Sequence, residues 1–125
     1  MKNNHKNNPN KRQRKDKVSV LKYIKARVEN GTGLVLSELK KEYNEEQLFF
    51  IALKYITTTK KALCKALDIP VEAGCRYKRK YEKQGLLVES IEDIVCPYTM
   101  HPAKRLSTNP DEFDDLTHTN QLTLF

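Results

Sequence analysis

The stretch TTTKKALCKALDIPVEAGCRYKRKYEKQGLLV, residues 57–88, decides the fold that the sequence predicts. Thr58 or Thr59 can cap a helix whose apolar side chains recur at helical spacing, namely Ala62, Leu63, Ala66 and Leu67. Asp68-Ile69-Pro70 ends this helix, because the residue before a proline avoids helical backbone angles. Proline is tolerated in a first helical turn, so a second helix is expected over 71–84. Two short helices joined by a tight turn are therefore predicted.

The second predicted helix has one apolar side. Ala73, Tyr77 and Tyr81 recur every four residues and are expected to face the core. Cationic residues take its other sides, and three more lysines lie on the helix before it. Gly85 is placed to form a left-handed cap at the end of the helix. Gly74, inside the helix, is expected to loosen it by about 1 kcal/mol.

Three further helices are predicted upstream of this pair. Apolar residues at helical spacing define a helix over 17–30 and a shorter one over 35–43, with a strand at Leu34-Val35-Leu36 as the alternative for the second. Asn44 followed three residues later by Gln47 matches a capping box. The helix that begins there runs to Ile56, is apolar on most sides, and is expected to be the most buried one.

A β-hairpin is predicted after the second of the two short helices. Residues 86–91 and 94–98 have the composition of strands, and Glu92-Asp93 between them has the composition of a turn. The expected fold class is therefore mainly α with a small β-hairpin, in one folded domain over residues 17–100.

Both ends of the chain differ from this domain in composition and charge. Residues 1–16 are dense in Asn, Lys and Arg, so a disordered basic arm is expected there. Residues 101–125 are expected to form an acidic, mostly flexible tail that ends in a peptide motif. Of the formal net charge of +7, residues 1–17 carry +6 and residues 110–125 carry −4, which leaves +5 between them. The middle of the chain is therefore basic in its own right.

The quoted stretch resembles the winged helix-turn-helix of bacterial regulators of the MarR type. In that pattern a T-[KR]-x-x-L-x-x-x-L-x-[IV] helix precedes a recognition helix that ends in L-x-x-x-G-L-[VIL]. The matching residues are Thr59, Lys60, Leu63, Leu67, Ile69, Gly85, Leu86 and Leu87. Asp68 departs from the pattern, since a turn glycine is common at its position. The resemblance covers about a quarter of the chain and implies a winged helix-turn-helix with an extra N-terminal helix, but it says little about function.

The basic arm and the basic second helix together predict double-stranded DNA as a partner. A helix-turn-helix places its second helix in the major groove while the first crosses the backbone. The candidate DNA-binding residues are Lys60, Lys61, Lys65, Cys75, Arg76, Lys78, Arg79, Lys80 and Lys83, with Glu72 beside them and with Lys11, Arg12, Arg14 and Lys15 in the arm. Because Arg pairs bidentately with guanine and with phosphate, base reading and anchoring both stay open. The hairpin tip, with Glu89, Glu92 and Asp93, is too acidic to be expected close to phosphates.

Other classes of function remain as alternatives. A winged helix can dock proteins without nucleic acid, and RNA binding is a further alternative that lacks an RRM or KH signature. An enzyme is not expected, because no His has a nucleophile or carboxylate at motif spacing and no Gly-rich phosphate loop is present. Cys64, Cys75 and Cys96 share no CxxC spacing, so they are expected to be free thiols with no zinc, and no cofactor is implied.

The last five residues, QLTLF (121–125), resemble the sliding-clamp-binding motif of bacteria, QL[SD]LF. The matching residues are Gln121, Leu122, Leu124 and Phe125, and Thr123 departs conservatively. The resemblance implies that Leu124 and Phe125 fill a hydrophobic pocket on the clamp and that Gln121 makes polar contacts beside it. Folding back as an edge strand of its own domain is the alternative for this segment.

Together these features predict a DNA-bound accessory factor of bacterial, phage or mobile-element replication or maintenance that also docks on the sliding clamp. A transcriptional regulator that binds an operator is the alternative, and monomer and homodimer both stay open. No apolar run approaches the roughly 18 residues of a membrane span, and the N-terminus lacks the apolar core of a signal peptide. Location in the cytoplasm, with no membrane contact, is therefore expected.

Overall fold

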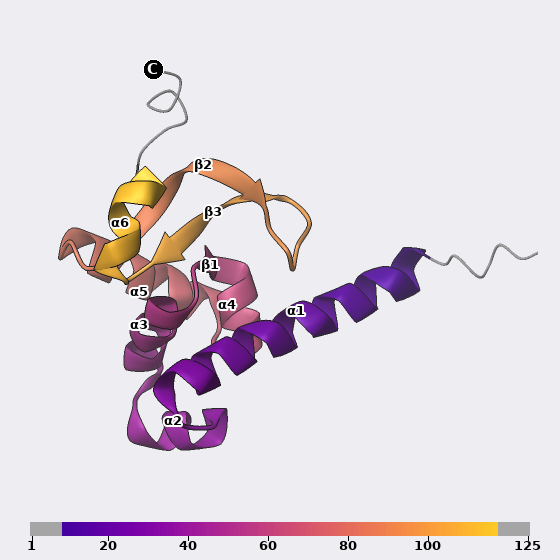
Figure 1. The fold of residues 1–125 in the computed structure, drawn as a ribbon, viewed down its shortest axis with the longest axis horizontal. Helices are drawn as coiled ribbons and strands as arrows, with labels where there is room; N and C mark the ends of the chain where they lie inside the picture. The colour runs from indigo at the N-terminus through magenta and orange to yellow at the C-terminus, as the bar shows by residue number, and fades with distance from the viewer. Residues whose placement is uncertain (1–8, 118–125) are drawn as a thin grey trace, which may run out of the picture.

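The computed structural model describes residues 9–117, with side chains from Lys17 onward, and residues 1–8 and 118–125 lie outside the described part. The elements, in chain order, are α1 (Pro9–Thr32), α2 (Leu36–Glu42), α3 (Glu45–Tyr55), β1 (Thr58–Thr59), α4 (Lys60–Leu67), α5 (Val71–Lys83), β2 (Val88–Val95), β3 (Pro102–Ser107) and α6 (Pro110–Thr117). The described residues are thus mainly helical with a small antiparallel sheet, as the sequence predicted (Figure 1).

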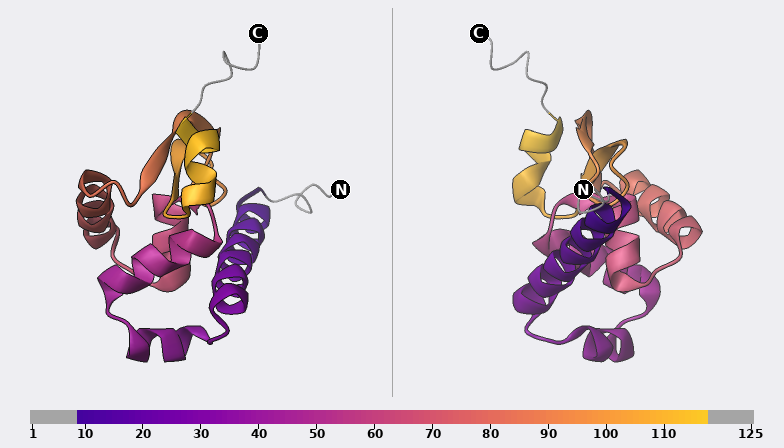
Figure 2. Two further views of the ribbon diagram at one scale, coloured as in Figure 1. Left: turned by 60° about the vertical axis from the view of Figure 1, so that its left-hand side comes forward. Right: turned by 90° about the vertical axis from the view of Figure 1, so that its right-hand side faces the viewer.

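The sheet has the strand order β1-β3-β2, with β3 in the centre. Thr58 of β1 pairs with Leu106, and Val88 at the start of β2 pairs with Ser107. Helix α6 lies against β2 and β3, on the opposite side of the sheet from α5 (Figure 2). Helices α1 and α4 pack on each other, and the N-terminal end of α1 extends past the rest of the molecule (Figure 1).

One apolar core joins these layers. Its fully buried side chains include Val28, Leu39, Phe49, Leu53, Leu63, Leu67 and Leu106. Burial of each such side chain contributes about 1.5–3 kcal/mol, so the core supplies most of the driving force for folding. The prediction that the helix before Ile56 is the most buried is wrong: four of the eleven residues of α3 are buried, but four of the eight residues of α4.

Local signals in the sequence placed several helix ends correctly. The Asn44 side chain accepts a hydrogen bond from the backbone N–H of Gln47 at 2.8 Å, and the Gln47 side chain accepts one from Asn44 at 3.0 Å, which confirms the capping box. Helix α5 ends within one residue of the predicted limit. Gly85 has φ +73°, and the Leu86 N–H donates to the Tyr81 carbonyl at 2.9 Å, which confirms the left-handed cap.

The turn between α4 and α5 is built without glycine. Asp68 takes the left-handed conformation there, with φ 59° and ψ 48°. Aspartate is one of the few residues that visit this region at modest cost. The Ile69 N–H then donates to the Cys64 carbonyl at 2.8 Å and closes the end of α4. Asp68 therefore adopts the left-handed conformation that a glycine commonly adopts at this position.

Helices α4 and α5 meet closely at Gly74. A Cβ placed on Gly74 would lie 2.5 Å from the Cys64 Sγ and 3.6 Å from the Phe49 ring. Any side chain at this position would require the Cys64 sulfur or the two helices to shift. Gly74, predicted only to loosen α5, thus has a packing role that helix propensity did not show.

The expected disordered arm over residues 1–16 is wrong for its second half, because α1 begins at Pro9. Proline suits a first helical turn, since its missing N–H would have no intrahelical acceptor there. The Lys, Arg and Gln residues that follow are good helix formers. Extending a helix whose later turns are already packed costs little, so a polar segment can continue it.

The predicted hairpin turn at Glu92-Asp93 is also wrong. Strand β2 runs through both residues, and the turn lies at residues 96–101, where the Cys96 N–H donates to the His101 carbonyl at 2.8 Å. A bulge lets β2 continue: Glu89 pairs with Leu106 and Asp93 with Lys104, so the residues between them oppose a single residue of β3. The contacts that hold this bulge come from β3, which the sequence had assigned to the tail.

The expected flexible tail is therefore folded over most of its described length. Residues 102–107 form the central strand of the sheet, and α6, in which Leu116 is buried, packs on β2 and β3. Two Thr residues expected only as caps also belong to the sheet. Thr59 is the N-cap of α4, but its hydroxyl lies 2.9 Å from the Cys96 Sγ and makes no capping bond.

We expect Gly74→Ala to destabilise the protein. Overpacking against Cys64 costs about 1–3 kcal/mol, and the gain of about 1 kcal/mol in helix propensity leaves a net loss of up to about 2 kcal/mol. Urea denaturation measures the change. Combined with Cys64→Ala, which removes the obstructing sulfur, the substitution should cost less than it does alone. If Gly74→Ala changes the stability by the same amount with and without Cys64→Ala, the Cys64 sulfur does not limit the space at Gly74.

Candidate nucleic-acid interface

The outward side of α5 carries a stripe of charged residues. Glu72, Arg76, Arg79 and Lys83 follow one another at spacings of four, three and four, which places them on one face of a helix. All four are exposed, and none takes part in an ion pair of the described residues. We call these four residues the outer stripe.

The neighbouring helix adds two exposed lysines. Lys61 and Lys65 lie one turn apart on α4, and neither has an ion-pair partner in the described part of the chain. With the outer stripe they give five cations and one carboxylate, a formal charge of +4. On α4 and α5, these five are the predicted DNA-binding cations that stay available to a partner.

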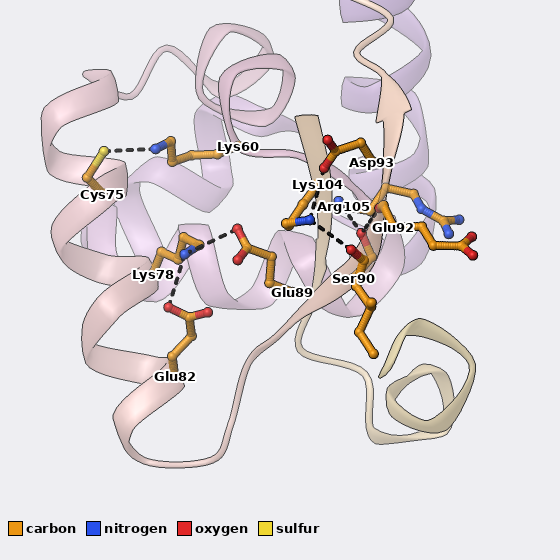
Figure 3. Close-up of polar contacts among 11 residues, drawn as sticks. Lys60, Cys75, Lys78, Glu82, Glu89, Ser90, Glu92, Asp93, Lys104 and Arg105 are labelled. Carbon is orange, nitrogen blue, oxygen red and sulfur yellow. Dashed lines mark hydrogen bonds and ion pairs between the residues drawn. The ribbon is translucent and has the colours of Figure 1, made fainter. Parts of the chain in front are cut away.

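The other predicted cations of the two helices are engaged within the protein, namely Lys60, Lys78 and Lys80, and Figure 3 shows the contacts of the first two. Lys60 Nζ donates to the Cys75 Sγ at 2.9 Å. Lys78 Nζ lies 3.1 Å from Glu82 and 3.3 Å from Glu89, which ties α5 to β2. Lys78 therefore lies on the flank of α5 that faces the sheet, and Lys60 of α4 contacts α5 through Cys75.

Lys78 is stabilised in its charged form. Its partial desolvation alone would lower the pKa, but the hydrogen bond to Glu82 and the charge of Glu89 raise it above the ordinary lysine value. On the opposite flank, Lys80 Nζ pairs with Glu46 of α3 at 2.6 Å. Both lysines therefore secure α5 to its neighbours, and their charge is already compensated.

Two tyrosines fix the inner side of α5 on α3. The Tyr77 ring meets Phe49 edge-on at 5.8 Å between centroids, and its hydroxyl donates to Glu45 at 2.8 Å. The Tyr81 ring lies 4.8 Å from that of Phe50. Desolvation and Glu46 raise the pKa of Tyr81 to about 12, so this phenol stays neutral at physiological pH. Helix α5 is thus anchored on one side and free on the other.

The hairpin is less repulsive to phosphates than the sequence suggested. Glu89 is paired with Lys78, and Asp93 accepts from Lys104 Nζ at 2.9 Å (Figure 3). The real turn, residues 96–101, contains no carboxylate. The expectation of an acidic tip is wrong, because it depended on a turn at Glu92-Asp93.

Only part of the division between paired and unpaired cations could be predicted from the sequence. The spacing of Lys78 and Glu82 is that of a helical ion pair. The pairing of Lys80 with Glu46, 34 residues away, depends on the packing of α5 on α3. No local pattern marks such a contact.

The remaining predicted residues lie in or beyond α1. Lys11, Arg12, Arg14 and Lys15 fall in the first turns of α1, and the 121–125 motif lies outside the described residues. In the described part of the chain, no cluster of His, Cys, Asp and Glu side chains could hold a metal ion, and no helix is long and apolar enough to cross a membrane.

Comparisons of the chain with models of protein families, with curated proteins and with solved structures gave no match. The function proposed below therefore depends on the residues of this chain alone.

We expect the three thiols to differ in reactivity. Cys75 is partly exposed on the flank of α5, whereas Cys64 and Cys96 are fully buried, and burial raises the pKa of Cys64 to about 11. Iodoacetamide at neutral pH should alkylate Cys75 first, as read by peptide mass spectrometry, and the other two only in denaturant. Alkylation of Cys64 at the same rate as Cys75 in the native protein would contradict the packing at Gly74.

Proposed function

We propose that this protein binds double-stranded DNA through a winged helix-turn-helix, with α5 in the major groove. The order α3, β1, α4, α5, β2, β3 supports this, since α4 and α5 supply the two helices and β2 and β3 the wing. The short link between α4 and α5 is what a helix-turn-helix requires. The long α1 is an addition to that unit.

The observation that carries the proposal is the outer stripe. Arg76, Arg79 and Lys83 are exposed on the side of α5 turned away from the core and are not paired with the protein's own carboxylates. Neutralising phosphates with such cations releases counterions, which supplies most of the affinity for duplex DNA. Lys61 and Lys65 on α4 are proposed as backbone contacts, and the cations in the first turns of α1 as further phosphate contacts.

We expect Arg76→Ala and Arg79→Ala each to weaken binding to duplex DNA by about tenfold, the effect of losing one good arginine contact. Fluorescence anisotropy with a labelled duplex, repeated at several salt concentrations, measures it. A lost phosphate contact should also lower the slope of log K against log salt by about 0.9.

Lys80→Ala is the matched control, because it removes one cation from the same helix but one that already pairs with Glu46. Its effect should stay below about threefold. If Lys80→Ala weakens binding as much as Arg76→Ala, α5 does not present its outer stripe to DNA. Absence of any duplex binding, together with capture of an acidic protein, would favour a docking module instead.

We further propose that residues 121–125 bind a bacterial sliding clamp, on the strength of the resemblance of QLTLF to its binding motif. Such a contact would make the chain an accessory factor of replication or maintenance, because DNA and clamp held together raise each other's effective concentration. A regulator that reads an operator would need no clamp.

Deleting residues 121–125 should abolish clamp binding in calorimetry and leave DNA binding unchanged. Burial of Leu124 and Phe125 contributes about 1.5–3 kcal/mol each, less ordering costs, so a micromolar contact is expected. Thr123→Ser, which moves the segment toward the motif, should keep the binding. No binding of the full chain at about 100 μM would end this proposal.

A further inference from the structure

Glu72 is the one carboxylate in the outer stripe, whose other three residues are cations. It lies in the first turn of α5 and shares the outer stripe with Arg76 and Arg79. Unlike Glu82 and Glu89, which pair with Lys78, it takes part in no ion pair in the described part of the chain. If the stripe binds a duplex, this exposed carboxylate at the end of α5 nearest the turn lies on the binding surface.

The chemistry of a carboxylate limits what Glu72 can contact on a duplex. An ionised Glu only accepts hydrogen bonds, and phosphate oxygens are acceptors too, so it gains nothing from the backbone. The major groove offers two exocyclic amino groups as donors, N4 of cytosine and N6 of adenine. Glu72 therefore either repels DNA or accepts a bond from a base.

Cytosine fits a carboxylate better than adenine does. In the major groove, the N6 of adenine stands between two acceptors, its own N7 and the O4 of thymine. The N4 of cytosine has an acceptor on one side only, the O6 of guanine. The second carboxylate oxygen thus meets less repulsion at cytosine.

Arg76 suits the same kind of site. It follows Glu72 by one helical turn, about 6 Å along the axis, which is close to two base-pair steps of about 3.4 Å. Its guanidinium matches the O6 and N7 of guanine. The two residues can therefore contact base pairs about two steps apart, where Glu72 requires a hydrogen-bond donor and Arg76 requires acceptors.

We propose that Glu72 determines specificity by accepting a hydrogen bond from the N4 amino group of a cytosine in the major groove, with Arg76 directed to a guanine nearby. The inference deepens the proposed function and rests on it. A helix-stabilising role is the competing explanation, since a carboxylate in the first turn interacts favourably with the helix dipole. That role would affect stability and leave base preference unchanged.

The test begins with selection of bound duplexes from a random pool by the full chain. The wild-type protein should restrict one position to cytosine, with discrimination of about tenfold or more against other bases. Glu72→Ala should accept all bases there and bind random duplex more tightly, since a repelling charge is gone. Glu38→Ala, which removes an exposed carboxylate from α2, is the matched control and should keep the wild-type preference.

A modified base tests the individual hydrogen bond. N4-methylcytosine keeps its pairing with guanine but puts a methyl group where Glu72 would find its donor. At the selected position it should weaken the wild-type protein by about tenfold and leave Glu72→Ala unaffected.

The outcomes separate the two proposals. If neither the wild-type chain nor Glu72→Ala binds any duplex, the proposed function fails. If the wild-type chain binds DNA but selects no cytosine, or if Glu72→Ala keeps the same restricted position, DNA binding stands and the specificity inference is overturned. Indifference of the wild-type protein to N4-methylcytosine would overturn it as well.

Discussion

The close approach of α4 and α5 at Gly74 is the constraint on which the rest of the structure depends. No side chain fits between Gly74 and the Cys64 sulfur, so the two helices meet along this line. At 3.6 residues per turn, Glu72, Arg76 and Arg79 lie on the opposite side of α5 from Gly74. Because Gly74 packs against α4, the outer stripe faces the solvent. Tyr77 and Tyr81 stabilise this orientation of α5 by packing on α3.

Charge pairing then selects which cations stay available. Lys78 and Lys80 leave α5 on its two flanks and meet carboxylates of β2 and α3. Their pairs hold the helix in place, and they remove two charges that composition alone would count toward a partner. An exposed pair contributes only about 0–1 kcal/mol, so the larger consequence is one of orientation. In the described part of the chain, the cations of α5 that stay unpaired therefore lie on one face of the helix.

The sheet ties the distant ends of the domain together. Strand β3 pairs with β2 on one side and with Thr58 and Thr59 on the other, and α6 covers it. The bulge in β2 is closed by Ser90, which donates to the Glu92 carbonyl at 2.8 Å and accepts from the Arg105 N–H at 2.9 Å (Figure 3). Without β3, residues 92 and 93 would lose the strand pairing that keeps them extended.

The sequence by itself determined the local elements: the capping box at Asn44, the turn at Asp68, the limits of α5 and its apolar face. Each depends on residues within about one turn of one another, and caps and periodicity report such contacts. Only the tertiary structure decided where the hairpin turns, which residues form the third strand and which cations are neutralised. Those outcomes depend on partners such as Lys80 and Glu46, which are 34 residues apart, so no local pattern encodes them.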